Sequence, residues 1–428
     1  MENVFDELKW RGLVAQTTDE HSLREAFNSP LTSYCGFDPT AASLHVGHLL
    51  QIIMLRKLQK AGHHVLCLVG GATGMIGDPR PTAERTLKTK ELTAEYVESI
   101  KTQISPFLDF SGSNPVTMVN NLDWFGDMTA IDFLRDLGKH FRVNQMLKKD
   151  SVSVRMTSEQ GISFTEFSYQ ILQGYDYLYL HRKYGCSLQT GALDQWGNIA
   201  VGADLIRRLD GDIVHGLTTP LITTANGEKF GKSEGNAIWL DSTLCSPYKF
   251  YQFWLNSDDS VIGNYLRVFT EISREEIEDL EDSTIREPHK RRAQVALAKY
   301  MTQFVHGDSE LQTALAVSAA VFGTADPRGL SPAAVSQMAD TLPSAKLDTT
   351  GYDLAPNLVK VGLAKSNNEA RRLIGDNAIT VNGIGVKDPY AKLEMRDQLG
   401  GIGWLVRRGR KTLGFIPVSY THLRAHET

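Results

Sequence analysis

Two short segments hold most of the residues whose types and spacing could act on a phosphate. The first is His45-Val46-Gly47-His48, and the second, about 180 residues later, is Lys229-Phe230-Gly231-Lys232-Ser233. Backbone N–H groups at the start of a helix attract phosphate, and two lysines with a hydroxyl can close over it. Together the segments predict a site that holds a polyphosphate between a helix and a basic loop. The chemistry this favours is attack by a carboxylate on the α-phosphate of ATP.

The elements that position these groups can be predicted from the flanking residues. The apolar run Ser33-Tyr34-Cys35-Gly36-Phe37 favours a buried strand, and Thr40 or Ser43 is expected to cap the helix that follows it. Because three positions separate His45 and His48, both imidazoles are expected on one face of that helix.

Neither segment is specific by itself. Gly47, between the two histidines, is expected to let a nucleotide approach the backbone. A lone H-x-G-H segment also fits chance, and a lone lysine segment also fits a solvated basic turn. Their combination favours the phosphate site.

A third pattern resembles a recognition surface. Tyr169, Gln173 and Asp176 are spaced i, i+4 and i+7, so in a helix they line one stripe. A phenol, an amide and a carboxylate make a poor core face and a good face for a polar ligand. For each residue alone, a structural hydrogen bond is the competing interpretation.

These segments resemble the signature motifs of class I aminoacyl-tRNA synthetases, and most closely those of the bacterial tyrosyl enzymes. H-V-G-H corresponds to the first signature and K-F-G-K-S to the second. Further matching segments, in chain order, are Tyr34 to Thr40, Gly70 to Pro79, Gly161 to Tyr169, Gln173 to Asp176 and Asp194 to Asn198. The likeness extends from about residue 1 to about residue 415.

The resemblance implies roles on the amino-acid side of the site. Tyr34 and Asp176 would bond the phenolic hydroxyl of L-tyrosine. The α-ammonium group would be bound by Asp78, Tyr169 and Gln173, and the substrate side of the pocket by Gln189 and Gln195. A site that hydrogen-bonds a substrate hydroxyl rejects the analogue that lacks it. The standard example is tyrosyl-tRNA synthetase, which discriminates against phenylalanine by a factor of about 10⁵.

The resemblance also implies a nucleotide side, with ATP as a substrate that carries Mg²⁺. Catalysis would use donors aimed at the phosphates, contributed by Thr40, His45, His48, Lys229, Lys232 and Ser233. The ATP-binding set is expected to comprise Cys35, Gly36, Asp38, His45, Gly47, His48, Asp194, Lys229 and Lys232. Gly231 would give the loop freedom to move. No protein metal site is predicted, since the ion would travel on the phosphates.

One departure from the family leaves alternatives open. The family has Gly-Gly-Ser or Gly-Gly-Ala before its Asp-Gln-Trp-Gly-Asn motif, whereas this chain has Gly191-Ala192-Leu193. The methyl group of Ala192 could crowd the adenylate. A catalytically impaired paralogue that binds structured RNA is therefore one alternative, and an enzyme that activates another aromatic acid is a second.

Composition is typical of a globular enzyme. The chain has 428 residues, of which 42% are hydrophobic and 22% charged. It contains no apolar run long enough to span a membrane, and its first residues lack a signal-peptide pattern. The four cysteines are scattered without metal-type spacing, so a reducing cytoplasm is the expected location.

The expected fold class is α/β, with a doubly wound parallel sheet (Rossmann-like) in a catalytic domain over residues 1–220. The resemblance implies that an insertion at about 124–160 helps to form a homodimer, and Phe164 is expected as an interface or core residue. A helical domain is expected at 221–325, which the resemblance implies serves anticodon recognition, and a linker at 326–350. Residues 351–415 resemble a small α+β RNA-binding domain of the ribosomal-protein type.

Charge changes sign along the chain. Residues 353–415 contain eleven Lys and Arg against six Asp and Glu, while the whole chain has a net charge of −5. A basic module on an acidic body indicates a polyanion partner, here tRNA(Tyr). The expected phosphate contacts are Lys365, Arg371, Arg372, Arg407, Arg408, Arg410 and Lys411, with a solvated basic face as the alternative. Residues 416–428 fit neither the strand pattern nor the family and are expected to be a non-native tail.

Overall fold

The computed structural model describes residues 3–80, 84–159, 161–228, 230–233, 236–345, 352–409 and 412–418. The chain divides into two compact units. The first comprises Met1–Leu244 with Ser257–Ala293, and the second comprises Cys245–Asn256 with Gln294–Thr428.

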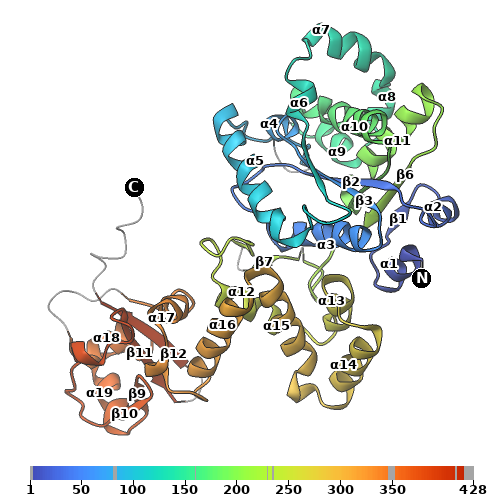
Figure 1. The fold of residues 1–428 in the computed structure, drawn as a ribbon. Coiled ribbons are helices and arrows are strands. Elements are labelled where there is room, and N and C mark those ends of the chain that lie inside the picture. The colour runs from blue at the N-terminus through green and yellow to red at the C-terminus, as the bar shows by residue number, and fades with distance from the viewer. Residues whose placement is uncertain are drawn as a thin grey trace. The chain divides into compact units, whose positions relative to one another are not determined.

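A six-stranded sheet forms the centre of the first unit (Figure 1), in the order β1-β6-β5-β2-β3-β4. Its strands are β1 (Gln16–Thr17), β2 (Thr32–Phe37), β3 (His64–Val69), β4 (Thr117–Asn120), β5 (Cys186–Ala192) and β6 (His215–Thr219). Strands β2 to β6 pair in parallel, and β1 adds an antiparallel edge. The central strands are nearly continuous apolar runs because both of their faces are buried. The predicted doubly wound sheet is confirmed.

Helices cover both faces of this sheet. α3 (Val46–Lys60) connects β2 to β3, and Figure 1 shows it on the side opposite to α10 (Phe164–Tyr184) and α11 (Trp196–Leu209). In the strand order, β3 and β4 lie on one side of β2, and β5 and β6 lie on the other. Right-handed crossovers that run in these two opposite directions place their helices on opposite faces of the sheet. The carboxyl ends of β2, β3, β4 and β5 therefore meet at one edge. The remaining helices before the insertion are α1 (Val4–Trp10), α2 (Glu20–Ala26), α4 (Thr73–Ile76) and α5 (Lys90–Ile104).

The segment between β4 and α10 forms only short helices. These are α6 (Leu122–Phe125), α7 (Ala130–Asp132), α8 (Val143–Met146) and α9 (Asp150–Met156). Several large apolar side chains here are exposed, among them Ile131 at 67% and Phe164 at 68%. Phe164 is thus not a core residue.

The first unit is completed by elements that follow β6. A two-stranded hairpin joins β7 (Lys232–Ser233) to β8 (Asn236–Ala237), and two helices come later, α13 (Ile262–Phe269) and α14 (Arg274–Arg286). α13 packs against α14 and α3.

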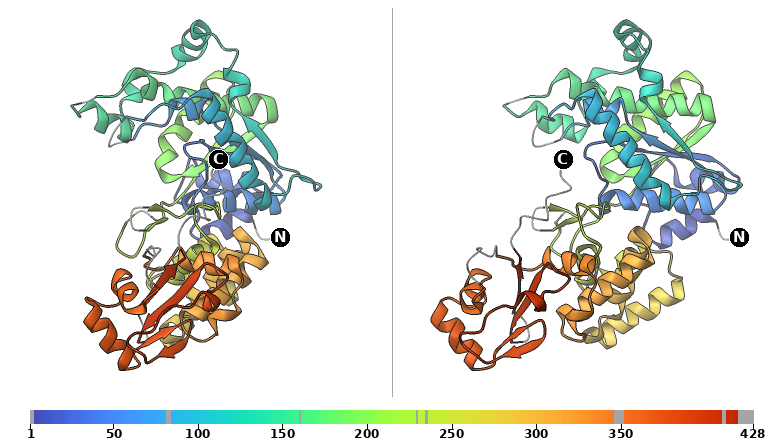
Figure 2. Two further views of the ribbon diagram at one scale, coloured as in Figure 1. Left: turned by 90° about the vertical axis from the view of Figure 1, so that its left-hand side faces the viewer. Right: turned by 60° about the vertical axis from the view of Figure 1, so that its left-hand side comes forward.

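The second unit joins helices to a small antiparallel sheet. Its helices are α12 (Pro247–Leu255), α15 (Arg292–His306), α16 (Asp308–Val321), α17 (Pro332–Ala339), α18 (Leu354–Lys360) and α19 (Asn367–Gly375). The sheet order is β10-β9-β11-β12, with β9 (Ile379–Val381), β10 (Ile384–Val386), β11 (Gly403–Arg408) and β12 (Thr412–Pro417). Figure 2 shows the β11–β12 hairpin as the long red strands. Trp404 and Ile379 lie in the core beneath α18 and α19.

Three local predictions were wrong. Neither Thr40 nor Ser43 caps α3, because His45 is its N-cap residue. The range predicted as a linker contains α17, which Ser331 caps. Strand β12 continues through Ile416 and Pro417, which pair with Trp404 and Gly403. None of the helices in the described ranges has the length and apolar character needed to span a bilayer.

Candidate active site

A carboxylate stands at the end of the central strand β2. Asp38 accepts hydrogen bonds from Thr73 Oγ1 at 2.6 Å and from the Tyr169 hydroxyl at 2.7 Å. Burial raises the pKa of Asp38, while these two donors act in the opposite direction. The phenol of Tyr169 is therefore fixed by Asp38, one turn away from Gln173 on α10.

A second carboxylate, Asp176, is buried deeper on α10, with 2% of its surface exposed. It accepts from Asn121 Nδ2 at 3.1 Å and from Trp124 Nε1 at 2.9 Å. Burial raises the pKa of Asp176 to about 8, although both hydrogen bonds favour the ionised form. The two donors hold this carboxylate in one orientation.

Two polar atoms beside the central strands lack partners. Tyr34 on β2 and Gln189 on β5 are register partners and are 1% and 2% exposed. Within the described ranges, the Tyr34 hydroxyl and Gln189 Oε1 have no hydrogen-bond partner. Burial raises the pKa of Tyr34 well above its usual value, and the charge of Asp176 adds to this. Unsatisfied buried polar atoms are rare and costly, so a polar ligand group is expected here.

A polar network includes Gln173 of α10 and connects it to α11 and to Asp78. Asp78 contacts Lys149 Nζ at 2.7 Å and accepts from Gln195 Nε2 at 3.0 Å. Asn198 Nδ2 donates to Gln173 Oε1 at 2.9 Å and to Gln195 Oε1 at 3.0 Å, and Asn198 Oδ1 accepts from Lys149 at 2.8 Å. Asp78 thus already holds an ammonium group, that of Lys149. The structure places Asp78, Gln173 and Gln195 in one hydrogen-bond network.

The two histidines lie at the N-terminus of α3, where His45 is the N-cap residue and His48 is the third residue of the helix. His45 Nδ1 accepts from the Gly47 N–H at 3.0 Å, and His48 Nδ1 accepts from the His45 N–H at 3.2 Å. Their ring centroids are 4.0 Å apart. A neutral imidazole that accepts at Nδ1 has its proton on Nε2, so both rings are fixed as Nε2–H tautomers.

Gly47 also has a role within the protein, beside the predicted approach of a nucleotide. A Cβ at this position would lie 2.7 Å from Cε1 of His45. The missing side chain makes room for the His45 ring, which rests on the helix end.

The lysine segment is described in part. Lys229 lies outside the described residues, and for Lys232 and Ser233 only the backbone, paired with β8, is described. Gly231 has φ +84°, where an L-residue is strained, and a Cβ there would lie 2.6 Å from Val46 Cγ2. The glycine brings the loop backbone against the start of α3.

The other predicted nucleotide contacts differ in accessibility. Gly36 and Asp194 are exposed, and Thr40 is half-buried. Cys35 is 2% exposed, and burial raises the pKa of its thiol to about 12. The strand ends thus present Gly36 and Asp194 outward, whereas the thiol of Cys35 faces the core.

Sequence reasoning missed several residues of this region. Asn121 and Trp124 hold Asp176, and Lys149 holds Asp78. Asn121 directly follows β4, so its place at a strand end is a signal that could have identified it. Lys149 and Trp124 come from the irregular segment after β4, and no local pattern marks them.

A group of cations near Asp38 was also missed. Arg85 Nε donates to the Asp78 carbonyl at 2.7 Å. Burial and the charges of Arg85 and Arg80 lower the pKa of Lys88, whereas Asp38 acts in the opposite direction. Three positive charges, those of Arg80, Arg85 and Lys88, therefore lie close enough to interact beside Asp38.

In the second unit, the predicted tRNA contacts fall into two groups. Lys365 and Arg372 are exposed, and Arg371 lies over the Tyr390 ring at 5.2 Å. Arg407 Nη2 instead donates to the carbonyls at the end of α16, at 2.7 Å for Val321, and Arg408 Nη1 donates to the Leu363 carbonyl at 2.9 Å. Arg410 and Lys411 lie outside the described residues.

Comparison with known proteins agrees with this geometry. Residues 25–323 match the model of the tRNA synthetases class I (W and Y), and the chain therefore belongs to that family. Residues 334–416 match the tyrosine–tRNA ligase SYY-like C-terminal domain.

Relatives over the full length point to one member of this family. A tyrosine–tRNA ligase of Streptomyces griseus is 53% identical over 98% of this chain and 99% of its own length. One from Leifsonia xyli is 52% identical over 96% and 93%. A C-terminally truncated mitochondrial tyrosyl-tRNA synthetase of Aspergillus nidulans superposes with a TM-score of 0.67 at 30% identity, over 73% of this chain and 92% of that one.

Proposed function

We propose that this protein is a tyrosine–tRNA ligase. It activates L-tyrosine with ATP to form tyrosyl-adenylate and pyrophosphate, and then transfers the tyrosyl group to the 3′ end of tRNA(Tyr). The observation that carries the amino-acid assignment is the pair of unpartnered buried atoms, the Tyr34 hydroxyl and Gln189 Oε1, together with the buried carboxyl group of Asp176. A phenolic hydroxyl can satisfy such groups and a phenyl ring cannot.

The substrate amine is assigned to the network around Asp78, with Tyr169 and Gln173. The contact between Asp78 and the Lys149 ammonium group supports this assignment, since it shows that the carboxylate is accessible to an ammonium group. Gln195 is cross-bonded in the same network, so the amine enters a site whose side chains are fixed before it arrives.

Negative charge grows on the α-phosphate and on pyrophosphate during activation. His45, His48 and Thr40, with Lys229, Lys232 and Ser233, are assigned to this charge, and Cys35, Gly36, Asp38, Gly47 and Asp194 to the rest of the nucleotide. Fixed donors contribute most when they need not reorganise, and both imidazoles are held as Nε2–H tautomers. Magnesium is part of the substrate, bound by the phosphates of ATP.

The partners follow from the second unit and from the segment after β4. Lys365, Arg371 and Arg372 are assigned to tRNA phosphates, with Arg410 and Lys411. Arg407 and Arg408 donate to main-chain carbonyls and are assigned to the stability of the module. The exposed apolar residues of the segment, Ile131, Leu134, Val143 and Phe164, favour a homodimer. The cytoplasmic location, where ATP and tRNA are found, belongs to the same proposal.

One assay tests the activity. ATP–pyrophosphate exchange is measured with tyrosine, phenylalanine, tryptophan and no amino acid. Exchange that depends on tyrosine alone is expected. Exchange with another aromatic acid instead would refute the specificity, and none with any amino acid would leave an RNA-binding paralogue.

A further inference from the structure

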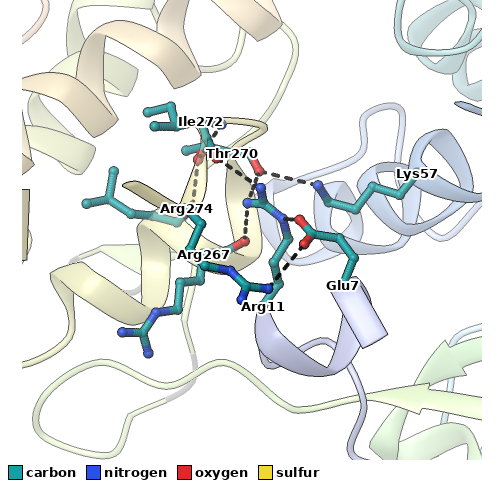
Figure 3. Close-up of polar contacts among 8 residues, drawn as sticks. Glu7, Arg11, Lys57, Arg267, Thr270, Ile272 and Arg274 are labelled. Carbon is teal, nitrogen blue, oxygen red and sulfur yellow. Dashed lines mark hydrogen bonds and ion pairs between the residues drawn. The ribbon is translucent and has the colours of Figure 1, made fainter. Parts of the chain in front are cut away.

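A buried arginine joins the N-terminal helix to the end of α13. Arg11, directly after α1, is 4% exposed and donates to the carbonyls of Arg267 at 3.1 Å, Thr270 at 2.9 Å and Ile272 at 2.9 Å. Its Nε also bonds the Glu7 carboxylate. Figure 3 shows this guanidinium reaching from α1 to the end of α13. Because the last carbonyls of a helix lack partners within it, Arg11 fixes the carboxyl end of α13.

The same turn is tied to α3, the helix that begins at the two histidines. Glu271 pairs with Arg56 at 3.1 Å and with Lys60 at 2.7 Å. Lys57, also drawn in Figure 3, reaches the Thr270 carbonyl at 3.5 Å. The junction of residues 270–272 therefore holds the far ends of α3 and α13 together.

α13 in turn carries an aromatic platform for the lysine segment. Phe230, 5% exposed, has its ring centroid 4.8 Å from that of Tyr265 and 5.2 Å from that of Phe269. Phe269 belongs to the turn whose carbonyls Arg11 binds. The Tyr265 hydroxyl donates to the Thr223 carbonyl at 2.8 Å, which also anchors the chain just before the lysine segment.

The next residue completes the attachment from the other helix. The Gly231 carbonyl accepts from the Ile238 N–H at 2.9 Å, and the Ile238 carbonyl accepts from the Val46 N–H at 3.0 Å. The segment between the two lysines is thus fastened to α13 by Phe230 and to α3 by Gly231.

From this geometry we infer that Phe230 and Arg11 are positioning residues for pyrophosphate release from ATP. Phe230 packs the lysine segment against α13, and Arg11 fixes the end of α13 that forms this packing surface, so the backbone at Gly231 is held beside the start of α3. The inference rests on the proposed role of the lysine segment. Neither residue needs to touch substrate.

The first test replaces Phe230→Leu, which keeps an apolar side chain and removes the ring contacts. We measure the single-turnover rate of adenylate formation, the tyrosine Kd and the pyrophosphate Kd of the reverse reaction. A misplaced reacting group costs up to about 100-fold, so a rate loss of about 10-fold is expected, with weaker pyrophosphate binding and a tyrosine Kd within about twofold. Phe27→Leu is the matched control, because Phe27 is also a buried phenylalanine and packs against Phe5 and His63.

A double-mutant cycle separates this inference from the proposed function. If Phe230 acts through Lys232, Phe230→Leu should change the rate less than about twofold once Lys232→Ala is present. An undiminished loss in that background overturns the positioning role. A Lys232→Ala variant with an unchanged rate would instead refute the proposed role of the lysine, and the inference with it.

Arg11→Lys tests the junction. Lysine keeps the charge but lacks the planar fork that bonds three carbonyls. We expect a threefold to 10-fold rate loss, an unchanged tyrosine Kd and no added loss in combination with Phe230→Leu. Arg24→Lys is the control, since Arg24 bonds only Asp6 and the region around α1. Parallel loss of tyrosine binding and rate would identify a purely structural role and contradict the inference.

Discussion

The two ends of this enzyme use polar residues in opposite ways. At the tyrosine end, Asp176 and Tyr34 are almost fully buried, and Asn121 and Trp124 hold the carboxylate in place. In the C-terminal module, Lys365 and Arg372 project into solvent. Buried groups make a missing hydroxyl costly and so give chemical selectivity, whereas exposed cations attract any polyanion by a charge that salt screens. Selectivity for tyrosine and binding of tRNA are thus assigned to different regions of the chain.

Basic character alone does not identify the attachment surface. Arg407 and Arg408 lie in the same basic stretch as the exposed cations, yet they cap carbonyls at the end of α16 and at Leu363. Part of the positive charge therefore stabilises the module itself.

The sharpest test of this division removes the module. A chain ended after residue 345 should retain tyrosine-dependent exchange within about twofold and lose tRNA charging by more than about 10³-fold, since most of the phosphate contacts are gone. Exchange and charging are assayed on the same preparation. Charging that persists would show that the first unit holds tRNA unaided.

The next largest effect is expected from replacing the buried carboxylate of Asp176. Asp176→Ala leaves Asn121 and Trp124 without an acceptor, so kcat/KM for tyrosine should fall about 100-fold or more, and activity with phenylalanine by much less. Asp123→Ala, at an exposed carboxylate of α6, serves as the control. Equal losses for both amino acids would contradict the assignment of Asp176 to the hydroxyl.

Stability should depend on pH through the same residue. The pKa of Asp176 is raised to about 8, above its ordinary value of 3.8, so the folded state binds this proton more tightly than the unfolded state does. The resulting stabilisation is complete below about pH 4 and is lost as pH rises towards 8. Between pH 5 and 8 the Tm of the wild type should therefore fall relative to that of Asp176→Asn, by thermal unfolding. A constant difference would mean that the carboxylate is ionised throughout.

The smallest effect is expected at the end of β5. Ala192 stands where the family has glycine, and its methyl group is predicted to crowd the adenylate. Ala192→Gly should raise tyrosine-dependent exchange by a few-fold, with tRNA affinity unchanged. An unchanged or lower rate would show that the site accommodates alanine without cost.

Much of the molecule was accessible from local patterns. The family, the parallel sheet and the stripe on α10 were confirmed because short apolar runs, helical spacing and dense motifs are local properties of the sequence. The linker and the end of β12 were predicted wrongly because they lack a strong local signal. α17 is short, and β12 is defined by its pairing with β11. The assigned roles of the site residues stay predictions.

The sequence alone determined which chemical groups are present and which helix or strand carries them, because periodicity and capping preferences act over a few residues. Only the tertiary structure decided how those groups are engaged. Tyr169 is bound to Asp38 and Asp78 to Lys149, and Arg11 reaches across more than 250 residues to the end of α13. The partners of these groups depend on which buried residues the crossovers bring together, because a polar group that has left water needs a hydrogen-bond partner. No local sequence pattern encodes that arrangement.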